Sequence, residues 1–182
     1  MRATLAFLVL FAFACDAMHA EPALGVGGDF TLTNHDGRRL SLHDLRGKRV
    51  LLFFGYTHCP DACPTMLSKI SRVYRTAGAA KKDLVTLFVS IDPDRDSPAA
   101  LKEYLGYFAS VNAIGLTGSK AELDKVVKSY GARYAIEPSA SAAGPSVSHS
   151  TYLYVIDRQG KTRKLFTHES TPDEIAAYVR TL

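Results

Sequence analysis

Two cysteines, Cys59 and Cys63, lie four residues apart and are the residues of this chain best suited to chemistry. A spacing of four places both side chains on one side of a helical turn, so both sulfurs can reach one ion. Thiolates are the ligands that soft ions such as Cu(I) prefer, and zinc also accepts them. The same pair could instead exchange with a disulfide, and the spacing alone leaves both chemistries open.

The segments around the cysteines predict a rigid turn at the edge of a sheet. Residues 50–54 form an unbroken apolar run, which is typical of a central strand buried on both faces. Leu67, Ile70 and Val73 then follow a helical period. A thiol where a helix begins meets unpaired backbone N–H groups, which favour the thiolate and lower its pKa.

A metal held by two sulfurs needs a further ligand, and histidine is the expected type. A closed zinc site built from cysteines is excluded, because the chain has three cysteines and Cys15 lies in its leader. His149 precedes a predicted strand that should lie beside the strand before the cysteines. The side chain of His58 should point away from Cys59. Three further histidines are expected to be solvated surface residues: His35, His43 and His168.

The N-terminus predicts an export signal. Residues 3–14 are apolar, a run too short to span a bilayer, which needs about 20 residues, but long enough for the core of a signal peptide. We predict a signal peptide over residues 1–20, a tether over 21–28 and one domain over 29–182. Cleavage before Cys15, with a lipid on that cysteine, competes with ordinary cleavage. The chain is thus expected in the periplasm or on the outer face of the bacterial inner membrane.

Composition narrows the class of protein. The 182 residues are enough for one domain with one core, and the 47% of hydrophobic residues speaks against a disordered chain. The net charge is +4, but lysine and arginine are scattered, with short clusters only at 46–49, 81–82 and 163–164. No nucleic-acid partner is expected, because such a partner requires basic residues gathered on one face.

The order of predicted elements indicates an α/β fold. A hairpin near residues 30–42 precedes the strand at 50–54, a helix, a strand at 84–91, two further helices, a hairpin at 151–166 and a last helix from Thr171. Pro98 predicts a helix start, with Asp96 or Ser97 as its cap. Residues 138–147 are small and polar and predict a mobile loop. The site is expected where helices begin at the ends of central strands.

Four stretches together resemble the Sco/SenC family of copper proteins, which help to assemble cytochrome c oxidase. They are GYTHCPDACP at 55–64, VSIDPDRDSP at 89–98, IGLTG at 114–118, and VSHS at 147–150 with YLYVID after it. The resemblance implies a thioredoxin-like fold, with a central mixed sheet flanked by helices and an N-terminal hairpin. It also implies Cu(I) held by Cys59, Cys63 and His149, with Cu(II) as a second state. Asp92 would assist the site or the docking of a partner.

The family also implies a partner. Copper would be delivered to the dinuclear copper site of cytochrome c oxidase subunit II, or the cysteines of that site would be reduced. Other periplasmic copper or thiol–disulfide proteins are further candidate partners, and a monomeric metallochaperone rather than an enzyme is expected. Ser148 stands where relatives often carry an acidic residue, which should weaken Cu(II) binding. The alternatives are a thiol–disulfide oxidoreductase, or a redox or copper sensor, that uses the same cysteine pair.

Overall fold

A seven-stranded mixed sheet forms the centre of the protein in the computed structural model, which describes residues 24–138 and 144–182. The strand order is β2-β1-β5-β4-β3-β8-β9. Strands β3, β4 and β5 run parallel, and the other pairings in this sheet are antiparallel. The strands are β1 (Thr31–Asn34), β2 (Arg39–Ser41), β3 (Arg49–Gly55), β4 (Leu84–Ser90), β5 (Ala113–Thr117), β8 (Leu153–Ile156) and β9 (Thr162–Phe166).

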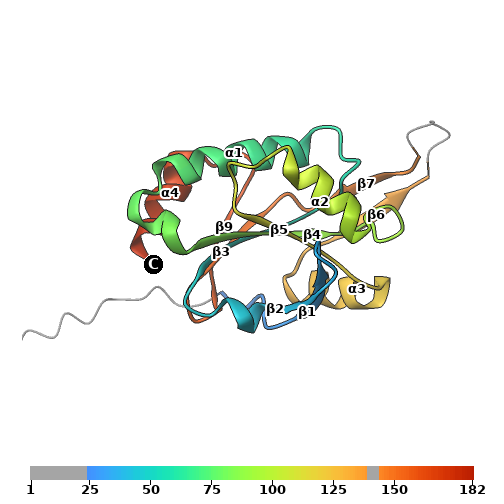
Figure 1. Cartoon of the computed structure of the whole chain (residues 1–182), viewed down its shortest axis with the longest axis horizontal. Coiled ribbons are helices and arrows are strands. Elements are labelled where there is room, and N and C mark those ends of the chain that lie inside the picture. The colour runs from blue at the N-terminus through green and yellow to red at the C-terminus, as the bar shows by residue number, and fades with distance from the viewer. Residues whose placement is uncertain (1–23, 139–143) are drawn as a thin grey trace, which may run out of the picture.

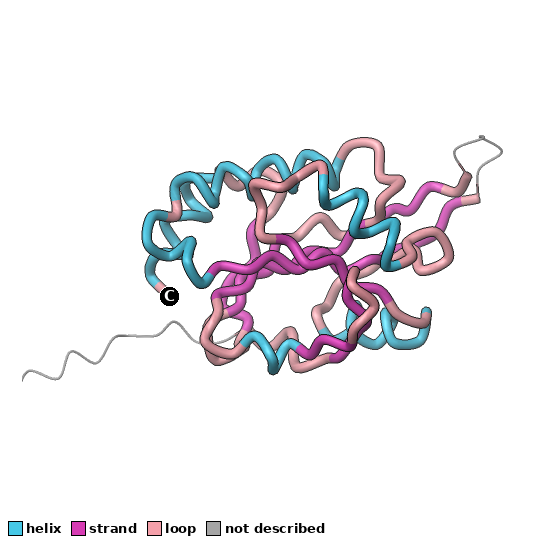
Figure 2. The backbone as a smooth tube through the Cα atoms, in the orientation of Figure 1, coloured by secondary structure: helices cyan, strands magenta, loops and turns pink. Residues whose placement is uncertain are grey.

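Helices cover both faces of this sheet. Figure 1 shows α1 (Ala62–Thr76), α2 (Pro98–Gly106) and α4 (Pro172–Thr181) on one face, and α3 (Lys120–Ser129) on the other. Two short 3-10 helices, Leu42–Leu45 and Gly78–Asp83, complete the described helical segments. Figure 2 shows the central strands of the main sheet between these helices. The α/β fold, with its mixed sheet and N-terminal hairpin, is confirmed.

Side chains alternate between the two layers of the core. Phe53 packs edge-on against Phe88, with ring centroids 5.1 Å apart, whereas Phe54 meets Tyr130 at the end of α3 at 6.0 Å. Successive residues of a strand point to opposite faces, so one strand supplies both layers. Every residue of β3 and of β4 is buried, which explains the apolar run at 50–54 and the mainly apolar sequence of β4.

A two-stranded arm lies outside the main sheet and was not predicted. Strands β6 (Tyr134–Glu137) and β7 (Ser146–His149) pair antiparallel, with Ile136 opposite Val147 and Tyr134 opposite His149. The predicted loop over 138–147 was therefore wrong at its end, because residues 146 and 147 belong to β7. His149 lies on a paired strand, which fixes its backbone, while residues 139–143 fall outside the described residues.

The segment predicted as a tether is hydrogen-bonded to the domain where it is described. The backbone N–H of Leu24 donates to Thr162 O at 2.9 Å, and that of Gly27 donates to Ser129 O at 2.8 Å. The predicted signal peptide and the choice of cleavage at Cys15 lie outside the described residues. Within residues 24–138 and 144–182, none of the helices has the length and apolar character that a membrane span requires.

Candidate metal centre

Cys59, Cys63 and His149 meet at the end of strand β3. One ligand atom from each lies within 4.8 Å of the other two. Cys63 Sγ is 3.8 Å from His149 Nε2, although 86 positions of sequence separate the two residues. Both cysteines are free thiols. The structure therefore brings together the three residues that the sequence indicates as ligands.

Gly55 makes room for the inner sulfur. A Cβ atom at this position would lie 2.6 Å from Cys63 Sγ and 3.0 Å from a ring carbon of Phe88. Real Cβ atoms do not approach other atoms so closely, so β3 must end in glycine for Cys63 to lie against it. Cys63 is only 1% exposed and forms the closed inner side of the site, whereas Cys59 is 9% exposed.

A buried carboxylate holds the loop that carries Cys59. Asp96 accepts hydrogen bonds from the hydroxyls of Thr57 and Ser90, both at 2.6 Å, and from the backbone N–H of Thr57. These contacts tie the loop after β3 to the end of β4. Burial raises the pKa of Asp96, while the donated hydrogen bonds oppose that rise. Ser97 caps α2, so Asp96 is a loop anchor and not the helix cap.

The backbone carbonyl of Ser150 orients the His149 ring. His149 Nδ1 lies 3.0 Å from Ser150 O. Because a carbonyl oxygen only accepts hydrogen bonds, Nδ1 carries the proton, and in the neutral ring Nε2 keeps its lone pair. Nε2 faces the sulfurs. Histidine ligands of metals are commonly oriented in this way, by a hydrogen bond from the ring nitrogen that does not bind the metal.

The two thiols differ strongly in acidity. The hydrogen bond from the Cys63 thiol, opposed by burial and aided by His149, lowers the pKa of Cys59 to about 3. The same hydrogen bond and burial raise the pKa of Cys63. Burial opposes a charge on His149, but its contacts with Cys59 and Ser150 raise its pKa overall. At neutral pH the pair therefore holds one thiolate and one thiol, and the neighbouring thiol matters more than the helix start that the sequence suggested.

Asp92 acts on the arm and not on the ligands directly. Its carboxylate is buried and accepts from Arg95 Nε at 2.5 Å, and Arg95 Nη2 donates to Pro145 O at 2.8 Å, just before β7. The Arg95 guanidinium also lies 5.7 Å from the centre of the Tyr56 ring. The Tyr56 hydroxyl accepts the backbone N–H of Val147 at 3.3 Å. Arg95 and Tyr56, which sequence reasoning missed, thus fasten the arm that carries His149.

The other described histidines lie outside the cluster. His58 is exposed and its Nδ1 contacts Thr57 Oγ1 at 3.1 Å, as expected for a side chain that points away from the sulfurs. His43 and His168 are exposed, as predicted. His35 differs from the prediction, because it is partly buried and accepts the backbone N–H of Gly115 at 3.2 Å.

The ligand set fits a soft ion with few ligands. Two sulfurs and one imidazole nitrogen suit Cu(I) better than the hard ions that require oxygen. Three ligands placed roughly 2.0–2.3 Å from one ion in a plane lie about 4 Å from each other, judged by zinc–ligand bond lengths. The observed separations, all within 4.8 Å, need only a small contraction to reach that geometry.

Comparisons with known proteins identify a family and several relatives of this chain. Residues 18–182 match the SCO1/SenC family. An SCO2-like protein of Rickettsia conorii is 36% identical over 161 residues, which cover 88% of this chain and 78% of that protein. The structure of Bradyrhizobium japonicum ScoI with copper bound is 40% identical with a TM-score of 0.77, over 86% of this chain and 99% of that one. BsSco, described with a disulfide switch as a member of the Sco family of cytochrome c oxidase assembly proteins, is 26% identical with a TM-score of 0.70, over 89% and 96%.

Proposed function

The chain belongs to the SCO1/SenC family, and we propose that it is a copper metallochaperone that carries one Cu(I) between Cys59, Cys63 and His149. One observation carries the proposal: two sulfurs and an oriented imidazole nitrogen lie within 4.8 Å of each other. The copper-bound structure of the Bradyrhizobium relative supports the choice of metal.

Cys59, Cys63 and His149 have different roles in binding copper. Cys59 meets the ion as a thiolate, and Cys63 gives up its proton when the ion binds, so loading releases a proton. His149 completes the site through Nε2. Because His149 lies on the arm, a shift of β7 away from β3 would remove one ligand and expose the ion to the thiolates of a partner.

The partner and compartment are parts of this proposal. We propose export by the predicted signal peptide and action in the periplasm or on the outer face of the inner membrane. There the protein would deliver copper to the dinuclear site of cytochrome c oxidase subunit II, or reduce the cysteines of that site. The description of BsSco as an oxidase assembly protein supports this partner. The mass of the chain recovered from cells tests export, since an uncleaved N-terminus would contradict it.

A Cu(I) titration of the reduced protein against a competing chelator tests the metal site. We expect one tightly bound Cu(I), with the affinity reduced at least about tenfold by His149→Ala and by Cys63→Ala, because each removes one ligand. His58→Ala is the matched control, since His58 is exposed next to Cys59 and lies outside the cluster. Equal affinity in the wild type and in His149→Ala would refute the ligand set.

Thiol–disulfide exchange is the second candidate function. The low pKa of Cys59 and the adjacent Cys63 thiol provide an attacking and a resolving sulfur. The disulfide switch described for BsSco also favours this reading. Reduction of an oxidised subunit II copper domain by the metal-free protein, with Cys59 and Cys63 oxidised to a disulfide, would favour exchange, whereas copper transfer that leaves that domain's thiols unchanged would favour the chaperone.

A further inference from the structure

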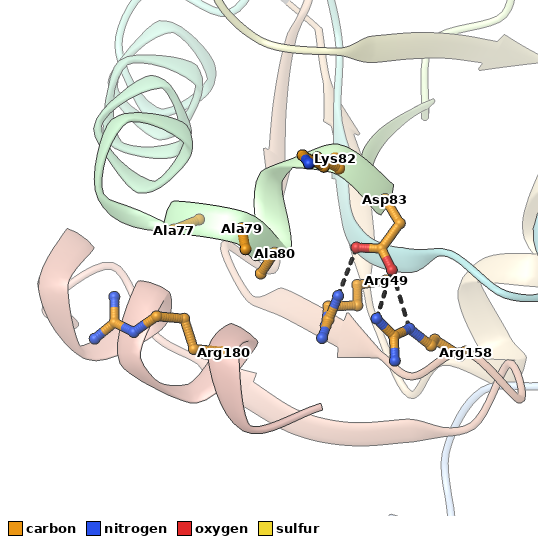
Figure 3. Close-up of a pocket in the computed structure, with 8 residues that line it drawn as sticks. All are labelled: Arg49, Ala77, Ala79, Ala80, Lys82, Asp83, Arg158 and Arg180. Atoms are coloured by element: carbon orange, nitrogen blue, oxygen red, sulfur yellow. Dashed lines mark hydrogen bonds and ion pairs between the residues drawn. The ribbon is translucent and has the colours of Figure 1, made fainter.

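A basic pocket lies at the end of the sheet opposite to the metal centre. It is lined by Arg49, Lys82, Asp83, Arg158 and Arg180, with three alanines from the segment after α1, and its volume is about 480 Å³. Figure 3 shows Arg49 and Arg158 both directed at the single carboxylate of Asp83. Two of the short basic clusters in the sequence meet here, since Arg49 belongs to the cluster at 46–49 and Lys82 to the cluster at 81–82.

The pocket holds more positive charge than its own residues neutralise. Asp83 pairs with Arg49 at 2.5 Å and with Arg158 at 2.6 Å, so two guanidinium groups share one carboxylate. Although burial opposes it, Arg158 and Arg49 hold the pKa of Asp83 below its usual range. Among the described residues, Arg180 donates to one partner, the neutral backbone oxygen of Thr76, and Lys82 is exposed. Four cationic side chains and one carboxylate thus line the pocket, with Arg49 and Arg158 directed at Asp83 and Arg180 turned toward the end of α1 (Figure 3).

Arg49 gives a second and independent indication of a ligand. Its side chain is only 8% exposed, and its Nε has no hydrogen-bond partner in the part of the chain that the structure describes. A buried N–H group of a charged side chain is costly to leave unpaired. An oxygen-rich anion would satisfy this group and the excess charge together, because guanidinium groups suit phosphate oxygens.

The position of the pocket indicates where such an anion comes from. Arg158 lies in the turn between β8 and β9, and Thr162, which begins β9, accepts the backbone N–H of Leu24, the first described residue. The predicted leader ends before Leu24, and the predicted lipid on Cys15 would hold this end of the mature chain at the membrane. The pocket is therefore at the end of the domain where the chain arrives from the membrane.

We propose that this pocket binds the phosphate group of an anionic phospholipid. Arg49 begins β3 and Gly55 ends it beside Cys63, so six residue steps of strand, about 20 Å, separate pocket and metal centre. Lipid bound at one end of β3 directs the copper site at the other end away from the bilayer. The inference rests on the proposed export, and copper binding does not depend on it.

Vesicle flotation tests the proposal with residues 21–182, which contain every described helix and strand and the whole core. The vesicles are phosphatidylcholine, alone or with phosphatidylglycerol, at low ionic strength. We expect binding only with phosphatidylglycerol, weakened about thirtyfold by Arg158→Gln with Arg180→Gln, as for two basic groups at an anionic surface. Lys125→Gln with Lys128→Gln on α3 removes the same charge from exposed positions and should weaken binding much less.

Further variants and measurements distinguish the possible outcomes of this experiment. Lys82→Glu changes an exposed side chain and the charge by the same two units, so it should weaken binding to a similar extent without affecting the fold. Equal loss in the pocket variants and in the α3 control would overturn the proposal, because binding would then follow net charge alone. Inorganic phosphate that binds at the pocket while vesicles do not would overturn the lipid assignment. Cu(I) affinity should be unchanged in all these variants, so a failed metal site is recognised separately.

Discussion

At the scale of single residues, the site depends on the inequality of two similar thiols. Cys59 is stabilised as a thiolate by the thiol of Cys63, and Cys63 is held protonated by the same contact and by burial. A single hydrogen bond therefore assigns the charge, and His149 adds to it from the other side. Neither sulfur would behave in this way alone, so the reactive unit is the pair.

The acidity of Cys59 predicts an unusual pH profile of alkylation. Because its pKa lies at about 3, Cys59 stays a thiolate across the range in which an ordinary thiol with a pKa of about 8.5 is protonated. Iodoacetamide should modify Cys59 of the reduced, metal-free protein at nearly equal rates between about pH 5 and pH 8. The rate should fall only as the pH approaches 3, where the thiolate is protonated.

Cys63→Ala is the control for this profile. It removes the thiol that donates to Cys59, so the pKa of Cys59 should rise and the alkylation rate should become pH-dependent. Mass spectrometry of the modified peptides identifies the cysteine that has reacted. A free thiol with a pKa of about 8.5 reacts about tenfold faster with each pH unit up to pH 8. Such a profile in the wild type would contradict a thiolate on Cys59 at neutral pH.

Gly55→Ala should damage both the fold and the metal centre. The added Cβ would lie 2.6 Å from Cys63 Sγ, and overpacking of this kind costs about 1–3 kcal/mol of unfolding free energy. Urea denaturation measures that loss, and the displaced sulfur should lower Cu(I) affinity as well. Gly106→Ala is the matched control, because no atom lies within 4 Å of its added Cβ. An unchanged stability and affinity in Gly55→Ala would show that the site does not need the glycine.

At the scale of elements, the ligands rest on supports of different kinds. Cys63 lies on α1, packed against the buried end of β3, whereas His149 lies on an arm outside the main sheet. The arm is fastened by Arg95 to Pro145 O and by Tyr56 to the backbone of Val147. These few polar contacts set the position of the third ligand relative to the two sulfurs.

Arg95→Lys should loosen the arm while it keeps a positive charge beside Asp92. A lysine ammonium cannot reproduce the fork with which Arg95 meets the Asp92 carboxylate and Pro145 O together. We expect faster hydrogen exchange at the Val147 amide and a Cu(I) affinity reduced about tenfold. Arg133→Lys, with an exposed side chain just before β6, is the control. If hydrogen exchange and Cu(I) affinity in Arg95→Lys equal those of the wild type, Arg95 does not hold the arm in position.

The burial of each element explains which elements could be predicted from the sequence. Strands β3 and β4 are buried on both faces and appear as apolar runs, and α2 and α4 carry Ser97 and Thr171 as caps with proline after each. The arm gave no such signal, because its strands are four residues long and bury little: Val147 is the only buried residue of either strand. Strands of this kind depend on pairing, which a local pattern does not reveal.

At the scale of the whole molecule, the topology decides what the sequence alone could not. The α/β class and the cysteine pair were readable from periodicity and spacing, but His149 was assigned by resemblance, since 86 positions separate it from Cys63. The Thr57, Ser90 and Asp96 network and the basic pocket were not foreseen, because their members come from separate segments. Strands β3 and β4 are parallel, so the segments that follow them meet at the metal centre. The segments that precede these strands meet at the opposite end of the sheet, at the pocket.

The depth of Cys63 has a kinetic consequence. Water cannot reach a sulfur that is 1% exposed, so Cys63 would hold copper until an incoming ligand took its place. Release is then second order: its rate follows the concentration of an acceptor that can reach the ion. Without an acceptor the residence time of copper is long, and with one it is short, although the affinity of the carrier is the same in both situations.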